Sequence, residues 1–138
     1  MERIVVGVDG SSSSADALRW AANQAALTGD ELHVITAWHL AAAYGYVPIA
    51  ADFDWERDGL SMIDQMIEKA VPADRRAEVH KHVMQGHPAE VLLDAADGAQ
   101  LLVVGSRGHG GFTGMLLGSV SQHLVTHARC PVVVVHSG

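Results

Sequence analysis

The stretch LLVVGSRGHGGFTGMLLGS, residues 101–119, decides the fold of this chain. Its first four residues are an unbroken apolar run, which is typical of a strand buried on both faces of a parallel sheet. The segment SVSQHLVTHA, which begins at Ser119, favours a helix. A glycine-rich loop between a strand and a helix leaves backbone N–H groups available at the C-terminal edge of a sheet. That arrangement suits an anion, and a phosphate chain above all.

The two best-known phosphate-binding motifs are absent from the chain. A P-loop needs a Gly-Lys pair, and no glycine here is followed by lysine. The dinucleotide motif G-x-G-x-x-G also fails, because Thr113 stands where the third glycine belongs. What remains is a different spacing, in which two residues separate Gly105 from Gly108 and nine more precede Gly118-Ser119. A structural turn between strand and helix is the alternative to a binding loop, and the strand–loop–helix context favours a loop that binds an anion.

The composition predicts one globular domain over residues 1–138, with 49% apolar residues. A formal charge of −7 argues against a nucleic-acid surface, which would carry a basic stripe. A phosphorylated ligand remains compatible with this charge, because backbone dipoles rather than lysines would bind it. Met1-Glu-Arg leads directly into a strand rather than a signal peptide, and no apolar run approaches the ~20 residues of a membrane span. A cytoplasmic protein is therefore expected.

Strands and helices are predicted to alternate along the chain. Strands are expected at 4–8, 32–37, 78–84, 101–104 and 131–136, and helices at 15–28, 60–70, 88–97 and 119–128. The serines at 11–14 supply the N-cap of the first helix, with Asp16 in its first turn. This order predicts a doubly wound α/β fold with a five-stranded parallel sheet and helices on both faces. With the strand order 3-2-1-4-5, Asp9 and the glycine loop face one crevice, where such sheets bind ligands.

Three segments resemble the universal stress protein family, and specifically its ATP-binding members. They are IVVGVDGS at 4–11, the loop from Gly105 to Ser119, and CPVVVV at 130–135. The resemblance covers nearly the whole chain, and residues 38–58 contribute least to it. It implies a Rossmann-like fold of the adenine nucleotide alpha hydrolase type, an ATP ligand that carries Mg²⁺, and a homodimer.

The resemblance also implies roles for individual residues. Asp9 would accept hydrogen bonds from the ribose or adenine, Ala37 would offer backbone groups to the adenine, and Gly105 would lie near the ribose. The phosphates would be held, mostly through main-chain N–H groups, by Gly108, Gly118, Ser119 and Val120. Independently of the resemblance, Arg107 lies within the loop, where its guanidinium either reaches a phosphate or remains a solvated charge. The predicted nucleotide site comprises Gly7, Val8, Asp9, Ala37, Val104, Gly105, Arg107, Gly108, Gly118, Ser119, Val120 and Ser121.

Dedicated catalytic chemistry is not indicated. The Ser-Gly-Gly-x-Asp-Ser loop of related adenylating enzymes is missing, since DGSSSS follows the first strand at 9–14. No nucleophile–base pair, paired carboxylates or metal shell is visible in the sequence. The leading hypothesis is therefore a regulatory protein that binds ATP. The alternatives are a slow ATPase or nucleotidyl-transfer enzyme, a structural dimer with an empty pocket, and a binder of another adenine nucleotide such as cyclic AMP.

Some of these residues also have a purely structural interpretation. Asp9 is equally suited to capping the following helix. The aromatic residues of the long connection, Tyr44, Tyr46, Phe53 and Trp55, either shield the adenine as a lid or pack the loop onto the domain, and packing is favoured. Cys130 is the only cysteine, and its position before an apolar strand favours a buried, inert thiol.

The nine histidines raise the question of a metal site. His123 and His127 are four residues apart on one helix face, and His80 and His82 share one strand face. No carboxylate–histidine cluster is visible beside either pair, so surface histidines rather than a metal site are predicted.

The sequence of the last strand predicts an interface between two copies of the chain. Val132, Val133, Val134 and Val135 are β-branched and uncharged, and an edge strand of this kind is prone to aggregation unless it is covered. Pairing with the same strand of a second copy across a two-fold axis would cover it.

Overall fold

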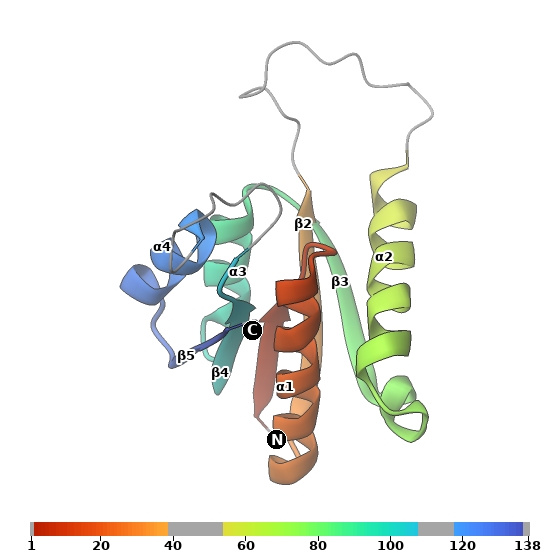
Figure 1. The fold of residues 1–138 in the computed structure, drawn as a ribbon. Helices are drawn as coiled ribbons and strands as arrows, with labels where there is room; N and C mark the ends of the chain where they lie inside the picture. Colours follow the sequence, from red (N-terminus) through yellow and green to blue (C-terminus); the bar gives the residue numbers. More distant parts are fainter. Residues whose placement is uncertain (1, 39–53, 108–117, 137–138) are drawn as a thin grey trace.

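The structure, a computed structural model, describes residues 2–38, 54–107 and 118–136. Its elements are β1 (Arg3–Gly7), α1 (Ser12–Thr28), β2 (Glu31–Trp38), α2 (Trp55–Ala70), the 3₁₀ helix η2 (Ala73–Glu78), β3 (Val79–Gln85), α3 (Pro88–Ala96), β4 (Leu101–Gly105), α4 (Ser119–His127) and β5 (Val132–Val135). The strands form one parallel sheet in the order β3-β2-β1-β4-β5 (Figure 1). The predicted strand order is confirmed.

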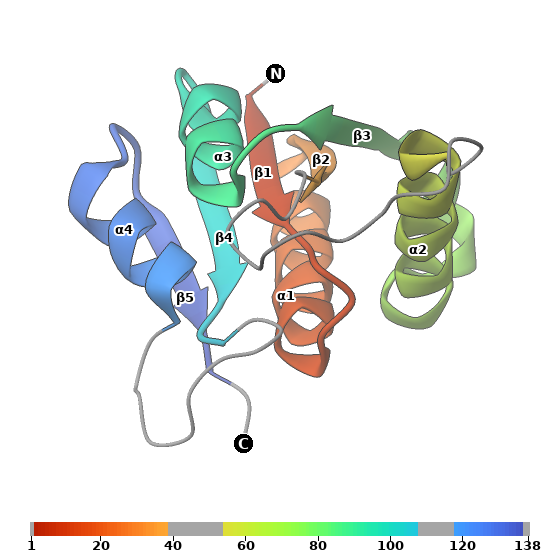
Figure 2. The same ribbon diagram turned by 90° about the horizontal axis from the view of Figure 1, so that it is seen from above.

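Helices cover both faces of the sheet, as the doubly wound pattern predicts. Helices α1 and α2 pack on one face, and α3 and α4 pack on the other (Figure 2). The central strand β1 serves both cores, because Ile4 and Val6 join the α1–α2 side while Val5 joins the α3–α4 side. A strand shared by two cores has no polar face, which explains why residues 4–6 of β1 are all apolar.

The two edge strands are less buried than the centre of the sheet. Strand β3 has exposed side chains on both faces, among them His80 and Lys81, so the prediction of a strand exposed on one face is wrong, and all four valines of β5 are half-buried. These valines still divide between the two cores, with Val133 and Val135 on one side and Val132 and Val134 on the other. None of the described helices combines the length and the apolar content that crossing a bilayer requires.

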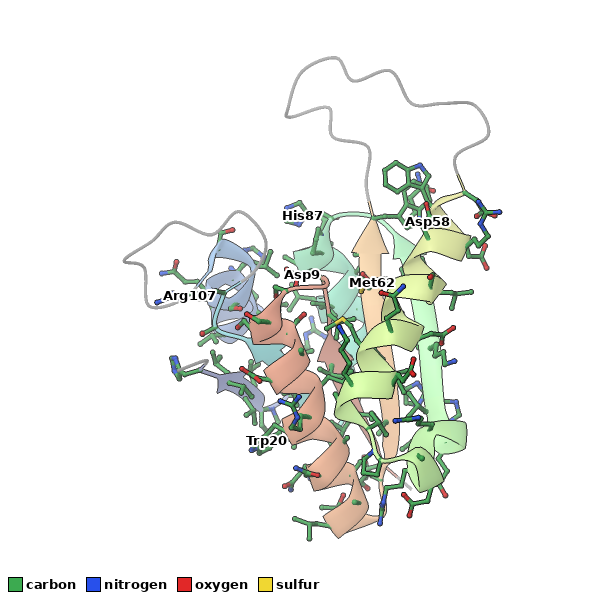
Figure 3. The ribbon with its side chains drawn as sticks, turned by 45° about the vertical axis from the view of Figure 1, so that its right-hand side comes forward. Asp9, Trp20, Asp58, Met62, His87 and Arg107 are labelled. Atoms are coloured by element: carbon green, nitrogen blue, oxygen red, sulfur yellow. The ribbon has the colours of Figure 1, made fainter. Side chains whose placement is uncertain are left out.

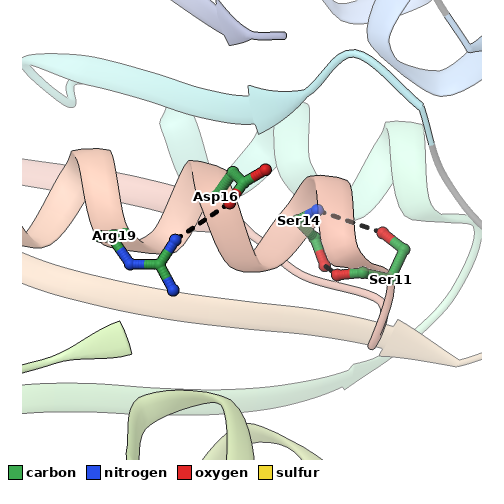
Figure 4. A network of polar contacts seen from close by, with 4 residues as sticks. All are labelled: Ser11, Ser14, Asp16 and Arg19. Carbon is green, nitrogen blue, oxygen red and sulfur yellow. Dashed lines mark hydrogen bonds and ion pairs between the residues drawn. The ribbon is translucent and has the colours of Figure 1, made fainter. Parts of the chain in front are cut away.

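Helix α1 begins at Ser12, earlier than the predicted start at Ala15. Ser11 is the N-cap, and its hydroxyl accepts a hydrogen bond from the N–H of Ser14 at 3.1 Å (Figure 4). The Ser14 hydroxyl donates back to the carbonyl of Ser11 at 3.0 Å. The serine hydroxyls thus bond to the backbone at the start of the helix, so serines occupy its first turn despite their modest helix propensity.

The predicted position of Asp16 in the first turn of α1 is wrong. Because the helix begins at Ser12, the first turn contains no acidic residue. The Asp16 carboxylate instead forms an ion pair with Arg19, three residues further on, at 3.0 Å (Figure 4). Both side chains are well exposed, so this pair contributes little to stability.

Helix α2 also begins earlier than its apolar pattern indicates. Its first residue is Trp55 rather than Leu60, and Asp54 caps it by accepting a hydrogen bond from the N–H of Arg57 at 3.0 Å. The buried positions begin only at Ile63. The first turns begin at the Asp54 cap and contact the sheet through Gly59, which lies close to Val83, and through Trp55, which stacks on Trp38. Contacts of this kind leave no apolar periodicity in the sequence.

One apolar side chain anchors α4 to the sheet. Leu124 is fully buried, whereas its neighbour Val125 is 49% exposed. We expect Leu124→Ala to lower the free energy of unfolding by about 2–5 kcal/mol, because the short helix would leave a cavity that it cannot fill. The matched control Val125→Ala should change it by less than about 0.5 kcal/mol. Urea denaturation of both variants measures the difference, and equal effects would show that α4 is not held by this contact.

Candidate functional site

The predicted site residues gather where β1 and β4 end side by side. The two strands pair in register, with Ile4 opposite Leu101 and Val6 opposite Val103, so their carboxyl ends share one edge. The turn into α1 leaves β1 through Asp9 and Gly10, and Gly10 has a φ of +87°, which favours glycine. Figure 3 shows Asp9 and the Arg107 segment at this same end of the sheet.

Asp9 shapes the turn that precedes α1. Its carboxylate accepts a hydrogen bond from the N–H of Ser11 at 2.9 Å, and its own N–H donates to the Ser14 hydroxyl at 3.2 Å. The N-cap of the helix is Ser11, so the structural interpretation of Asp9 as the cap is wrong. Asp9 builds an Asx turn instead, and it lies exposed at this edge of the sheet.

Gly105 brings β4 into direct contact with α1. A Cβ built on Gly105 would lie 2.7 Å from the backbone carbonyl of Ser13, a distance that no side chain tolerates. The Ser13 hydroxyl also accepts a hydrogen bond from the N–H of Arg107 at 3.2 Å. On the other side, the Ser121 hydroxyl of α4 donates to the carbonyl of Gly105 at 2.6 Å. The first turns of two helices therefore meet at one glycine.

The ends of the glycine-rich loop are tied together at its base. The N–H of Ser106 donates to the carbonyl of Val135 at 2.9 Å, and the N–H of Gly118 donates to the carbonyl of Ser106 at 2.6 Å. In this arrangement the Gly118 amide is already engaged, so it is not available as the phosphate donor that the sequence predicts. Residues 108–117, including Gly108, lie outside the described residues.

Helix α4 begins next to this closed base without a side-chain cap from the described residues. Gly118 is the N-cap, and the first bond within the helix runs from the N–H of Gln122 to the carbonyl of Gly118 at 2.9 Å. The amides of Ser119, Val120 and Ser121 precede that bond, so none of them has a partner within the helix. Ser119 is exposed and Val120 is half-buried, which places two of these amides near the surface.

Several predicted site residues are explained by packing instead. Val8, Val104 and Ser121 are at most 6% exposed. A Cβ on Gly7 would lie 2.6 Å from a methyl group of Leu92, so Gly7 allows α3 to approach the sheet. These buried side chains therefore support the edge from within and do not line a site at its surface.

The start of the long connection after β2 is marked by stacked indoles. The rings of Trp38 and Trp55 are parallel, with centroids 5.1 Å apart. Half-buried Ala37 stands just before this stack, near the end of β2. Tyr44, Tyr46 and Phe53, which the lid hypothesis also includes, lie outside the described residues.

A hollow along the outer side of α2 does not fit a phosphate. Its lining includes four carboxylates, against which Arg57 is the one basic side chain among the described residues that line it. Clustered negative charge repels a polyphosphate, so the sheet edge remains the candidate site. Cys130, half-buried beneath α4, has a thiol whose pKa is raised by burial, which agrees with an unreactive thiol.

The structure also contains a carboxylate–histidine cluster that the sequence did not indicate. Glu31, His33 and His80 come together on neighbouring strands, and His82 hydrogen-bonds to His33. The hydrogen bond from His33 lowers the pKa of the Glu31 carboxyl, and burial lowers the pKa of His82. The sequence analysis missed this cluster because it could not give the pairing register of the two strands. Glu31 fell outside the predicted strand, and only the observed pairing places His33 opposite His80.

Comparison with known proteins agrees with this architecture. The chain is 37% identical over 139 residues to a universal stress protein of Mycobacterium tuberculosis, covering 96% of this chain and 47% of that relative. A universal stress protein of Mycolicibacterium smegmatis is 37% identical over 135 residues, covering 96% of this chain and 45% of the relative. The chain thus spans about half the length of the curated relatives it matches.

Solved structures match the chain from end to end. A universal stress protein crystallised in complex with cAMP superposes with a TM-score of 0.72 at 29% identity, covering 99% of this chain and 98% of that chain. A universal stress protein from Archaeoglobus fulgidus gives a TM-score of 0.66 at 25% identity, with 98% of each chain covered. The model of the universal stress protein family matches residues 1–136. The chain therefore belongs to the universal stress protein family.

Proposed function

We propose that this protein binds an adenine nucleotide, ATP in the first place, at the edge where β1 and β4 end, and that it acts as a regulatory stress protein of the cytoplasm. The observation that carries the proposal is the meeting of the first turns of α1 and α4 at Gly105. Helix N-termini carry partial positive charge and unpaired amides, which together suit a phosphate. The edge is also where chain connections leave to opposite faces of the sheet, the usual place for a ligand in this fold.

In this proposal the phosphates lie against the start of α4. The amides of Ser119 and Val120 donate to phosphate oxygens, with Arg107 supplying a charge from the other end of the loop. Asp9 accepts a hydrogen bond from the ribose or adenine. Backbone groups of Ala37 face the adenine. Mg²⁺ arrives on the triphosphate, whose oxygens are the ligands it prefers.

Cyclic AMP is the second candidate ligand. A relative at 29% identity was crystallised with cAMP, which supports recognition of the adenosine half of the ligand in this family. Cyclic AMP has one phosphate, so it would engage fewer of the amides at α4 than a triphosphate. The ratio of the affinities for ATP and cyclic AMP therefore measures how much the loop and the amides of α4 contribute to binding.

Ser119 allows the main-chain contribution to be separated from the side chain. It is the first residue of α4, a position at which proline is tolerated because its N–H is not needed by the helix. Gly118 has φ −67° and ψ 162°, a conformation that a following proline accepts. Ser119→Ala removes the hydroxyl alone, whereas Ser119→Pro removes the hydroxyl and the amide.

We expect ATP at about a hundred times its Kd to stabilise the native protein by roughly 2.7 kcal/mol, a rise in Tm on the order of 10 °C. Ser119→Ala should keep most of this rise, and Ser119→Pro should lose most of it at the same ATP concentration. Differential scanning fluorimetry with ATP, ADP and cAMP measures the shifts, and phosphate release in the same samples decides whether bound ATP is hydrolysed. Equal rises in Tm for the two variants would show that the Ser119 amide does not bind the nucleotide. If no nucleotide raises the Tm of the wild-type protein, the proposal is wrong.

Asp9 offers a test of the ribose or adenine contact. Asp9→Asn keeps an oxygen that accepts from the N–H of Ser11, so the turn and the Tm without ligand should be preserved. Removing the charged acceptor should weaken ATP binding about tenfold or more, since a hydrogen bond to a charged group contributes about 1.5–3 kcal/mol. Titration calorimetry gives the affinity. Unchanged affinity would assign Asp9 to the turn alone.

We further propose that the protein dimerises through the outer edge of β5. The carbonyls of Pro131 and Val135 accept hydrogen bonds from β4, so the alternate residues Val132 and Val134 direct their backbone groups outward. An uncharged edge strand with outward N–H and C=O groups is a template for pairing with a second copy. A two-fold axis beside β5 would join two sheets into one.

Proline substitutions distinguish the outer edge from the inner ladder. Val134→Pro removes an outward N–H and should convert a dimer into a folded monomer of similar Tm. Val133→Pro removes an N–H that faces β4 and should cost about 3 kcal/mol or more of stability. Light scattering after gel filtration gives the mass, and thermal melts give the stability. A Val134→Pro protein that remains dimeric would place the interface elsewhere.

A further inference from the structure

A polar cluster on β2 and β3 lies apart from the candidate nucleotide site. Glu31 and His33 are two residues apart at the start of β2, so they share one face of the sheet. His80 stands directly opposite His33 in the parallel register, and His82 follows on the same face of β3. Because Glu31 is the first residue of β2, the cluster lies at the opposite end of that strand from Ala37.

This face of the sheet is only partly covered by helices. Ile35, on the same face of β2, packs into the α3–α4 core, while His80 on the edge strand is exposed. Figure 2 shows α4 at the far side of the sheet from β3. The cluster therefore stands on a rigid sheet and remains open to solvent, a position from which side chains can bind an ion without unfolding.

His33 is the centre of the cluster. Its Nε2 lies 3.0 Å from Glu31 Oε1, and its Nδ1 lies 2.9 Å from His82 Nε2. The ring of His80 stacks on that of His33, with centroids 4.4 Å apart and planes inclined by 8°.

We propose that Glu31, His33 and His80 bind a divalent ion of the Zn²⁺ class through one carboxylate oxygen and two imidazole nitrogens. One ligand atom from each residue already lies within 4.8 Å of the others. Bonds of about 2.0–2.1 Å in a tetrahedral site bring ligand atoms to roughly 3.4 Å from one another. Rotation of the exposed His80 ring and of the Glu31 side chain would bring the ligand atoms from their present separation to the shorter one that the ion needs. A water takes the fourth position.

His82 has a different role in this arrangement. When Nε2 of His33 turns from Glu31 to the ion, Nδ1–H of His33 donates to Nε2 of His82 across the existing 2.9 Å contact. A partner of this kind fixes the tautomer and the orientation of a ligating histidine. His82 is thus a positioning residue rather than a ligand.

A second pair of histidines provides the rival site. His123 and His127 are one turn apart on α4, and their rings lie 4.4 Å apart at 42°. Both are exposed, and among the described residues no carboxylate joins them in a metal-ligating group. Two ligands on a surface helix bind more weakly than three ligands on paired strands, so the strand cluster is expected to fill first.

The test is a Zn²⁺ titration of untagged, chelator-treated protein by calorimetry, without nucleotide. The wild-type protein should bind one equivalent tightly, and saturation should raise the Tm. His80→Ala and Glu31→Gln should each weaken the tight site by tenfold or more. His82→Phe, which keeps a flat ring without the acceptor nitrogen, should weaken it about 10–100-fold. Thermal melts without metal confirm that each variant is folded.

The matched control is the double variant His123→Ala/His127→Ala, which should retain the tight site. Loss of tight binding in this control, with wild-type affinity in His80→Ala, would overturn the proposal and assign the ion to α4. Equal Zn²⁺ affinity in wild-type and His80→Ala protein would overturn it as well. Because no nucleotide is present, neither result depends on the proposed ATP site.

Discussion

The contact between the last residue of β4 and the first turn of α1 is the constraint on which the candidate site depends. Gly105 has no side chain, and the backbone of Ser13 occupies the space that a Cβ would need. The carbonyl of Gly105 also accepts a hydrogen bond from the Ser121 hydroxyl of α4. One glycine therefore holds two helices from opposite faces of the sheet at a common edge. Widening this contact would separate the two helix N-termini that the proposed nucleotide site uses.

The proposed site reconciles an anionic ligand with an acidic chain. The formal charge is −7, and in the proposal the attraction at the edge comes mainly from peptide dipoles rather than from lysine side chains. Dipoles at helix ends act over the first turn only, so they attract a phosphate locally without making the whole surface basic. The proposed Zn²⁺ cluster uses the opposite chemistry, a carboxylate with imidazoles, at the other end of β2. The sheet thus separates two kinds of polar group along its length.

The strands and the layers followed from apolar runs, because strands buried on both faces leave a clear pattern, whereas the strand order was inferred from the doubly wound fold class and is confirmed by the structure. Helix starts did not, since α1 and α2 begin at the Ser11 and Asp54 caps, several residues before their first buried apolar side chains. The site was predicted by position along the chain. The hydrogen bonds within the candidate site were not predicted, because a bond such as that from the Gly118 N–H to the Ser106 carbonyl depends on backbone geometry. The histidine cluster depended on strand register, which residue patterns do not specify for a half-exposed edge strand.

The stacked indoles of Trp38 and Trp55 have a consequence for how this protein can vary. Strand β2 ends at one ring and α2 begins at the other, so the two elements meet at a fixed junction. The side chains at the end of β2 and the start of α2 are thus in contact. Doubling the length of a flexible connection costs only about 0.6 kcal/mol of closure entropy. Insertions there, including grafted peptides or whole small domains, are therefore compatible with an unaltered sheet.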